Sequence, residues 1–418
     1  MSATEGVPAR TSPFGFLRPA VAVAAAYLVA ALVWLAAGDV LPGGRWLAVH
    51  LFTLGILTNL IVALTHHFAQ TLLHTPGGDA SRWRLALLNG GVLATLVAWP
   101  GGSTWLLAAG SVLVVVAVAW LYVDLRRMRK ASLTGRFAFI VRGYERACGA
   151  FFHGATLGVL LGIGVLGGAW YGAVRVAHLH VNILGWGGLT LLATVVFFGP
   201  TMLRTRMIPG TDVMAVRALR HGATSLSVAT GALILTGFGG SVGVGFRLLA
   251  AAALAVYAVA ATAVCISVLR AGRAGHASPH AWMIQAACVW FVAAVWVDVA
   301  VVASGHLRLL DALGAALIVG VLGQAILASL NYLAPMVWSG GQKRRAAARE
   351  RLERAPLPRA AVFNVGALLV VGATAAGSLS APVPHGLVVG GWALVATAAA
   401  SQLALLAREA VPALVRRA

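Results

Sequence analysis

Long runs of apolar residues, separated by short polar connections, dominate the hydrophobic pattern of this chain. Most runs extend for about 20 residues, the length an α-helix needs to cross ~30 Å of hydrocarbon. Helices are expected because they satisfy their own backbone hydrogen bonds in lipid. The pattern predicts an all-α integral membrane protein with about twelve transmembrane helices. We expect them at 16–37, 46–73, 83–99, 103–124, 146–168, 174–203, 221–238, 243–269, 281–303, 307–338, 360–378 and 386–408.

The composition agrees with a lipid bilayer as the main partner. Of the 418 residues, 60% are hydrophobic and only 10% are charged, with a mean hydropathy of +0.89. A soluble chain would carry about a quarter charged residues. The first residues contain no signal-peptide cleavage motif, so we expect no removable leader. Residues 16–408 are therefore expected to form a single membrane domain between tails at 1–15 and 409–418.

The net charge is +20, and it is the position of the charges along the chain that is informative. If the N-terminus lies inside, all but four of the 31 Lys and Arg residues lie on the cytoplasmic side of the predicted spans. This bias predicts a multi-pass plasma-membrane protein with both termini in the cytoplasm. The basic clusters at 126–130 and 343–345 are then orientation signals and contacts for anionic lipid, and nucleic acid is not an expected partner. The four exceptions are Arg45, Arg175, Arg247 and Arg308.

An internal repeat organises the predicted helices. HLFTLG at 50–55 recurs as HVNILG at 180–185, and GWGG at 185–188 recurs as GVLG at 320–323. The three segments lie on the second, sixth and tenth predicted helices, so each repeat holds four helices. We expect three pseudo-symmetric four-helix repeats, at roughly 16–124, 146–269 and 281–408, around a common axis.

Histidines near the outer ends of the helices are the first candidates for chemistry. A neutral imidazole buried in lipid can ligate haem iron or copper without introducing a charge. His50 and His180 occupy equivalent repeat positions, so we expect them at similar depths near the axis. His178 lies about 200° around the helix from His180 and shares a face with Asn182, so these two histidines should meet different partners.

A second set of histidines is expected at the inner side. His66 and His67 end the second helix, where a histidine can cap terminal carbonyls or bind a second metal or a quinone head group. His50 and His66 are separated by about 24 Å along one helix, so they cannot serve the same site. His276 and His280 are expected in a loop.

Carboxylates and cysteines are few. Asp298 and Asp311 are expected in the outer part of the membrane, where an ionisable group is a functional candidate. The three cysteines, Cys148, Cys265 and Cys288, each stand alone in an apolar helix and are expected to act as small hydrophobic residues. No CxxC or CxxCH motif occurs, which excludes covalent c-type haem and iron–sulfur clusters.

Three stretches carry a family resemblance: HLFTLGILTN at 50–59, AHLHVNILGWGGLT at 177–190 and NYLAP at 331–335. The chain resembles haem–copper oxidase subunit I over residues 16 to 408. It looks more specifically like the membrane domain found with bacterial multicopper oxidases and copper nitrite reductases, and like NnrS-like haem–copper membrane proteins. The resemblance implies haem b and/or copper as cofactors. It implies His50 and His180 as ligands, with His178, His67 and His66 as further metal candidates.

The chain also departs from that family. Ala315 stands at the third-repeat position that corresponds to His50 and His180, and the tenth helix has no His-x-His pair. A complete oxygen-reducing binuclear centre is therefore not expected. The chain carries no cupredoxin domain, so a cupredoxin or multicopper partner is expected to be a separate polypeptide.

The resulting hypothesis is a haem- and/or copper-binding membrane redox protein, an oxidoreductase component. It would pass electrons from quinol to an external copper protein, or handle copper or nitric oxide. Two alternatives stay open. One is a multi-span transporter or permease, with the outer histidines, Asp298 and Asp311 along the substrate path. The other is a metal-free membrane anchor for a redox partner.

Overall fold

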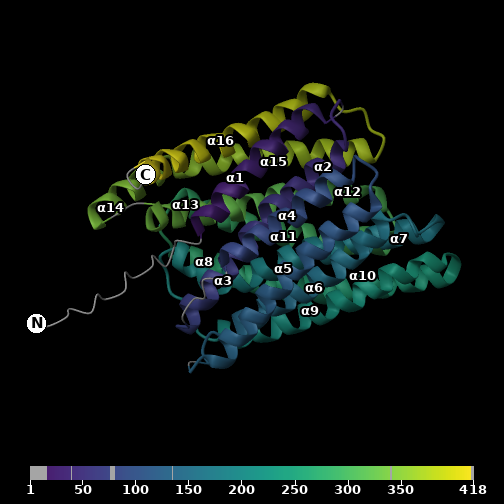
Figure 1. The fold of residues 1–418 in the computed structure, drawn as a ribbon, viewed down its shortest axis with the longest axis horizontal. Helices are drawn as coiled ribbons and strands as arrows, with labels where there is room; N and C mark the ends of the chain where they lie inside the picture. The colour runs from purple at the N-terminus through teal and green to yellow at the C-terminus, as the bar shows by residue number, and fades with distance from the viewer. Residues whose placement is uncertain (1–16, 39, 76–80, 134, 339–340, 416–418) are drawn as a thin grey trace, which may run out of the picture.

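The computed structural model describes residues 17–38, 40–75, 81–133, 135–338 and 341–415. Within these ranges every regular element is helical and no strand occurs. The long helices run side by side as one bundle, and the start of α1 lies at the same end as the end of α16 (Figure 1). The elements are α1 (Leu17–Ala37), α2 (Gly44–His50), η1 (Leu51–Thr58), α3 (Asn59–Leu73), α4 (Ser81–Ala98), α5 (Thr104–Ala131), α6 (Ala138–Gly162), α7 (Gly168–His180), η2 (Val181–Leu189), α8 (Thr190–Met202), α9 (Thr211–Leu235), η3 (Thr236–Phe238), α10 (Gly240–Gly272), α11 (Pro279–Ser304), η4 (Leu307–Leu309), α12 (Leu310–Ala315), η5 (Ala316–Gly323), α13 (Gln324–Trp338), α14 (Gln342–Leu352), α15 (Pro356–Ser378) and α16 (His385–Val415).

Nine helical stretches in the described part of the chain are long and apolar enough to cross a membrane. Large apolar side chains such as Val29 and Val112, which are 64% and 59% exposed, face outward from the bundle. An apolar outer surface of this kind suits contact with lipid. The chain is therefore a multi-pass all-α membrane protein, which confirms that part of the prediction. The nine stretches are Leu17–Ala37, Gly44–Leu73, Thr104–Ala131, Gly168–Met202, Gly240–Gly272, Pro279–Ser304, Leu307–Trp338, Pro356–Ser378 and His385–Glu409.

Three further long helices, α4, α6 and α9, lie in the same bundle but are not among the nine. Charged residues such as Arg84 and Glu145 lower the hydropathy of these helices. Each nevertheless packs along its neighbours, α4 on α5, α6 on α7, and α9 on α10. The count of twelve membrane crossings stays a prediction.

Several helices begin or end well outside the predicted spans. α6 begins at Ala138 instead of 146, α9 begins at Thr211 instead of 221, and α5 continues to Ala131 beyond 124. The apolar runs predict only the part of a helix that lies in lipid. The hydrogen-bonded helix continues through the charged residues at its ends, because those residues are solvated and still have good helical propensity.

Three stretches of π-helix interrupt the helices that the sequence places at the centre. They are η1, η2 and η5, and each continues directly from a preceding α-helix into a following one. The wider π turn is rare and is frequently found at functional sites. The three stretches begin at residues 51, 181 and 316, next to His50, His180 and Ala315, which are the equivalent positions in the sequence pattern.

Each π-helical stretch contains a glycine that allows a neighbouring helix to approach. A Cβ added at Gly55 or Gly320 would lie 2.5 Å from the Tyr27 ring or 2.6 Å from the Trp290 ring. The same addition at Gly185 would lie 2.5 Å from the Ala150 methyl group. Those three neighbours come from α1, α11 and α6, so a small residue lets the helices pack closely in all three places.

Polar side chains capture carbonyl groups within the π-helical stretches. Asn59 donates to the Gly55 carbonyl at 2.7 Å, and Gln324 donates to the Gly320 carbonyl at 2.7 Å. Asn89 of α4 and Asn364 of α15 each form reciprocal amide hydrogen bonds with one of these side chains. In η2 the hydroxyl of Tyr257 donates to the Leu184 carbonyl at 2.7 Å. These bonds satisfy polar groups that lipid could not satisfy.

The three π-helical stretches also contact one another. The indole of Trp186 in η2 donates to the Thr58 hydroxyl in η1 at 3.1 Å. A Cβ at Gly187 in η2 would be 3.3 Å from Leu322 in η5 and 3.6 Å from Leu57 in η1. Residues about 130 apart in the chain therefore meet at the centre of the bundle.

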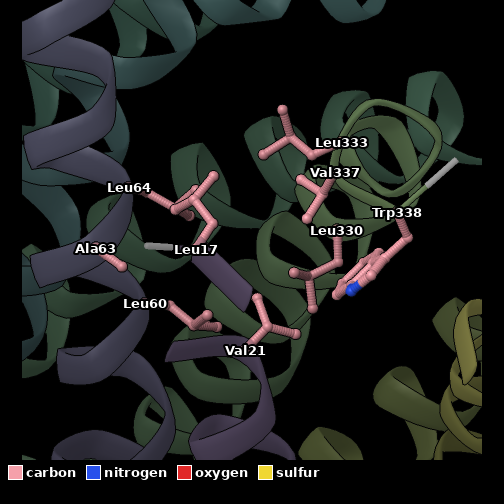
Figure 2. A pocket seen from close by; sticks show the side chains of 9 residues that line it. All are labelled: Leu17, Val21, Leu60, Ala63, Leu64, Leu330, Leu333, Val337 and Trp338. Atoms are coloured by element: carbon pink, nitrogen blue, oxygen red, sulfur yellow. The ribbon is translucent and has the colours of Figure 1, made fainter. Parts of the chain in front are cut away.

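The first helix is joined to α13 at the opposite end of the sequence. Arg18 of α1 donates to the Val337 carbonyl at 2.7 Å. Figure 2 shows the apolar side chains around a small recess beside this contact. No polar atom lines the recess, so it offers packing and no chemistry. Its lining residues are Leu17, Val21, Leu60, Ala63, Leu64, Leu330, Leu333, Val337 and Trp338.

Candidate functional site

The site begins at His50, the last residue of α2 before η1. Its Nδ1 lies 2.8 Å from the Trp46 carbonyl, one turn earlier in the same helix. The imidazole stacks on the Trp46 ring with 3.9 Å between centroids, and Trp46 stacks in turn on Trp99 at 4.6 Å. The aromatic stack and the carbonyl together hold the orientation of the His50 ring.

His178 of α7 lies within electrostatic range of the His50 imidazole. The Nδ1 of His178 is 2.9 Å from the Gly154 carbonyl of α6. A Cβ added at Gly158 would come within 2.9 Å of the His178 ring, so the absence of a side chain there makes room for the histidine.

Asn182 lies against His178, as its position one turn later predicts. Its amide nitrogen donates to the His178 carbonyl at 2.8 Å and lies 3.2 Å from His178 Nδ1. The second contact is not a hydrogen bond, because the Nδ1 proton already points to the Gly154 carbonyl. Asn182 itself packs against Gly154, where a Cβ would clash with the amide group.

The tautomers of His50 and His178 follow from these contacts. A carbonyl oxygen can only accept a hydrogen bond, so Nδ1 carries the proton in both rings. Each neutral ring then presents an unprotonated Nε2. Metal-binding histidines commonly donate their other N–H to a carbonyl in this way, which makes both residues suitable ligands.

His180 has a different environment. Its Nδ1 lies 2.8 Å from the Val176 carbonyl, and its Nε2 lies 3.0 Å from Oδ1 of Asp298 on α11. Both side chains are buried, at 4% and 5% exposure. A lone pair on Nε2 facing a carboxylate oxygen would be repulsive, so a proton lies between the two atoms. His180 and Asp298 therefore form a buried pair that holds a proton, and both ring nitrogens of His180 are in use.

The outer cluster thus divides into two parts. His50 and His180 have the same local backbone surroundings, because each precedes a π-helical stretch and each contacts the carbonyl four residues earlier. The histidine within electrostatic range of His50 is His178, and His180 is turned toward Asp298. Asp311 lies apart from both, in an exposed ion pair with Arg45 at 3.1 Å.

The inner histidines do not join this cluster. His66 and His67 are buried on α3, at 6% and 8% exposure. His66 lies in the electrostatic field of Arg84, whose guanidinium donates to Asp124 at 2.7 Å. A buried cation beside His66 disfavours a metal cation at that position. The buried pair of Arg84 and Asp124 was not singled out from the sequence, because its two residues lie at the ends of predicted spans.

One expectation about another residue is wrong. His280 is not in a loop: it lies in the first turn of α11 and is 2% exposed. The sequence contains a signal for this helix start, because Ser278 caps the helix by accepting from the Ala281 amide and Pro279 follows it. The three cysteines lie buried in three different helices, as expected, and the sequence did not indicate that Cys265 of α10 and Cys288 of α11 are neighbours.

His280 also faces a polar partner that sequence reasoning missed. It lies within reach of the Asn331 amide of α13, and its ring packs edge-on against Tyr332 at 5.4 Å. Among the described residues neither side chain has a well-formed hydrogen bond. Asn331 was noted in the sequence only as part of NYLAP, and burial of this kind has no signature in the sequence pattern.

The number of ligands limits what the outer cluster could hold. Within the described ranges, no group of three or more His, Cys, Asp or Glu side chains could hold a metal ion. A metal at His50 and His178 would therefore have two protein ligands. Two neutral imidazoles suit the axial positions of a haem iron or a two-coordinate copper(I) ion. No family model matches the chain, and no match was found among curated proteins.

Proposed function

We propose that this protein is a haem- and/or copper-binding membrane redox protein whose metal ligands are His50 and His178. The observation that carries the proposal is that His50 and His178 lie within electrostatic range of each other, each with its Nδ1 atom tied to a carbonyl. This arrangement leaves two Nε2 atoms for a metal. It replaces His180 by His178 in the pair of ligands, because the ring nitrogens of His180 are already in use.

The proposal includes a threefold architecture with twelve membrane crossings. Its support is the recurrence of the same local features in η1, η2 and η5: a π-helical stretch, a glycine against the first helix of each repeat, and a captured carbonyl. Random packing would not place these features at matching chain positions. The helices α4, α6 and α9 then complete four crossings in each repeat.

The orientation follows from the distribution of charge. With the basic connections in the cytoplasm of a plasma-membrane protein, His50 and His178 lie toward the external face. A metal there could exchange electrons with an external cupredoxin or multicopper protein, and a quinol in the bilayer is the proposed donor. The resemblance to haem–copper oxidase subunit I and to NnrS-like proteins is consistent with that direction, as is the handling of copper or nitric oxide.

The chain's own residues would set the properties of the site. Haem or copper, when bound, would supply the one-electron chemistry. His50 and His178 would hold it, and the stack of Trp46 on Trp99 would exclude water from one side. The His180–Asp298 pair holds a proton in the same half of the bundle, where it could balance a change of charge.

Purification with haem and copper supplied during expression tests the proposal. We expect a visible haem spectrum, bound copper, or both, with total metal near one per chain. His50→Ala and His178→Ala should each lose most of the bound metal. His153→Ala is a matched control, because the exposed His153 also directs Nδ1 to a carbonyl one turn earlier, at 2.8 Å. A folded, colourless and metal-free protein would contradict the proposal and leave the two metal-free alternatives, a transporter or a membrane anchor.

A proton-coupled transporter is the second candidate, and the buried His180–Asp298 pair favours it. Ionisable pairs inside membranes mark proton pathways in many transporters. In proteoliposomes that contain a pH-sensitive dye, this candidate predicts proton flux that Asp298→Asn abolishes and Asp311→Asn leaves intact. Flux that is independent of Asp298 would exclude it.

A further inference from the structure

A hollow of about 500 Å³ opens at the end of the bundle that carries the basic connections. Its walls come from the connection before α6 and from the connection between α8 and α9. It is separate from the outer histidines, which lie at the other end of their helices. The lining residues are Arg136, Phe137, Phe139, Arg206, Met207, Ile208, Pro209, Gly210 and Asp212.

Two guanidinium groups make the hollow basic. Arg136 and Arg206 come from different connections and are both exposed. Across the described residues, neither forms an ion pair with a carboxylate. Asp212, in the first turn of α9, is the one carboxylate in the lining. Two cations against one anion leave the hollow positive, and a guanidinium suits phosphate because it can donate two parallel hydrogen bonds.

The rest of the lining is apolar. Arg136 lies over the Phe137 ring at 5.2 Å, and Phe139 is buried. Met207, Ile208 and Pro209 line the hollow from the connection between α8 and α9. A soluble phosphate would not need such a surface. A phospholipid would use both parts, with its phosphate on the arginines and its glycerol and upper acyl carbons on the apolar residues.

We propose that this hollow is a binding site for the phosphate group of an anionic phospholipid from the surrounding leaflet. The basic connections lie on the side where positive charge is retained, which is the cytoplasmic side with its anionic lipids. The site requires only that the chain spans the membrane. It does not depend on metal binding at His50 and His178.

Native mass spectrometry of the purified full-length protein provides the test. The probes are phosphatidylglycerol, phosphatidylcholine and inorganic phosphate, each titrated separately. We expect retention of phosphatidylglycerol that phosphatidylcholine does not match. Arg136→Gln/Arg206→Gln should weaken it about thirtyfold, on the basis of about fivefold for each arginine at an anionic surface.

Two control proteins keep the result interpretable. Lys343→Gln/Arg344→Gln removes the same charge from α14, a basic cluster expected to attract anionic lipid only in general, and should weaken the retention of phosphatidylglycerol much less. Arg136→Lys/Arg206→Lys keeps the charge, so partial retention there shows that loss in the Gln variant is not unfolding. Equal loss in the α14 variant would overturn the proposal, because general charge would then explain binding. Binding of inorganic phosphate that displaces the lipid would also overturn it, in favour of a soluble phosphate.

Discussion

His50 and His180 occupy the same place in their helices and have different surroundings. Each is the last α-helical residue before a π-helical stretch, and each directs Nδ1 to the carbonyl four residues earlier at 2.8 Å. The Nε2 of His180 meets Asp298 at 3.0 Å. His50 instead stacks on Trp46 and lies within electrostatic range of His178.

The comparison separates two kinds of cause. The contact with the carbonyl is local, because any histidine in a helix can reach back one turn. The partner of the His180 Nε2 atom is decided by tertiary packing, because Asp298 comes from α11. The same residue in the same local structure therefore pairs with a carboxylate in one place and lies against a tryptophan ring in the other.

Removing Asp298 should have the largest effect. Asp298→Ala leaves the Nε2 atom of the buried His180 without its partner, and breaking a buried pair costs about 3–5 kcal/mol. We expect a matching fall in the free energy of unfolding, measured by denaturation in detergent. His180→Leu/Asp298→Leu removes both polar groups and should lose much less. Equal losses in the single and double variants would show that the two residues are not coupled.

Filling the space beside Asn182 should have an intermediate effect. In Gly154→Ala the new methyl group clashes with the Asn182 amide, which disturbs the support of His178. Overpacking of this kind costs about 1–3 kcal/mol. Gly149→Ala on the same helix faces open space and should be neutral or stabilising, since alanine is the better helix former. If the two variants unfold alike in a thermal melt, His178 is not held as described.

Loss of the aromatic stack should have a smaller effect. Trp46→Leu keeps an apolar side chain and removes the stacked contacts with His50 and Trp99, worth about 0.5–1.5 kcal/mol. The melting temperature should fall modestly, and any metal spectrum should broaden as the His50 ring gains freedom. Trp105→Leu is the control, because Trp105 is 87% exposed. An unchanged melting temperature in Trp46→Leu would show that the aromatic stack does not stabilise the site.

The exposed ion pair at the outer surface should matter least. Arg45 and Asp311 are 68% and 45% exposed, so solvent screens their attraction. Asp311→Ala should change the free energy of unfolding by less than about 1 kcal/mol and should become neutral in high salt. If Asp311→Ala lowered the free energy of unfolding as much as Asp298→Ala, solvent exposure would not explain the difference between the two carboxylates.

Some features of the structure could be predicted from the sequence and others could not. The apolar runs predicted the helices, and the glycine spacing pointed to the segments that become η1, η2 and η5. The predicted helix ends were wrong, by up to ten residues at α9, because the apolar runs mark only the part of a helix that lies in lipid. Three features could not be predicted: the proximity of His50 and His178, the ion pair of Arg84 with Asp124, and the burial of His280. Each depends on contacts between helices that no periodicity records.

The amino-acid sequence alone determined that this chain is helical, that it spans the membrane many times, and which residues precede the π-helical stretches. Those properties follow from hydrophobic length, backbone hydrogen bonding and local spacing, all of which act along the chain. Tertiary structure alone decided what surrounds the Nε2 atom of each histidine. Those surroundings depend on a side chain from another helix, more than a hundred residues away in the sequence.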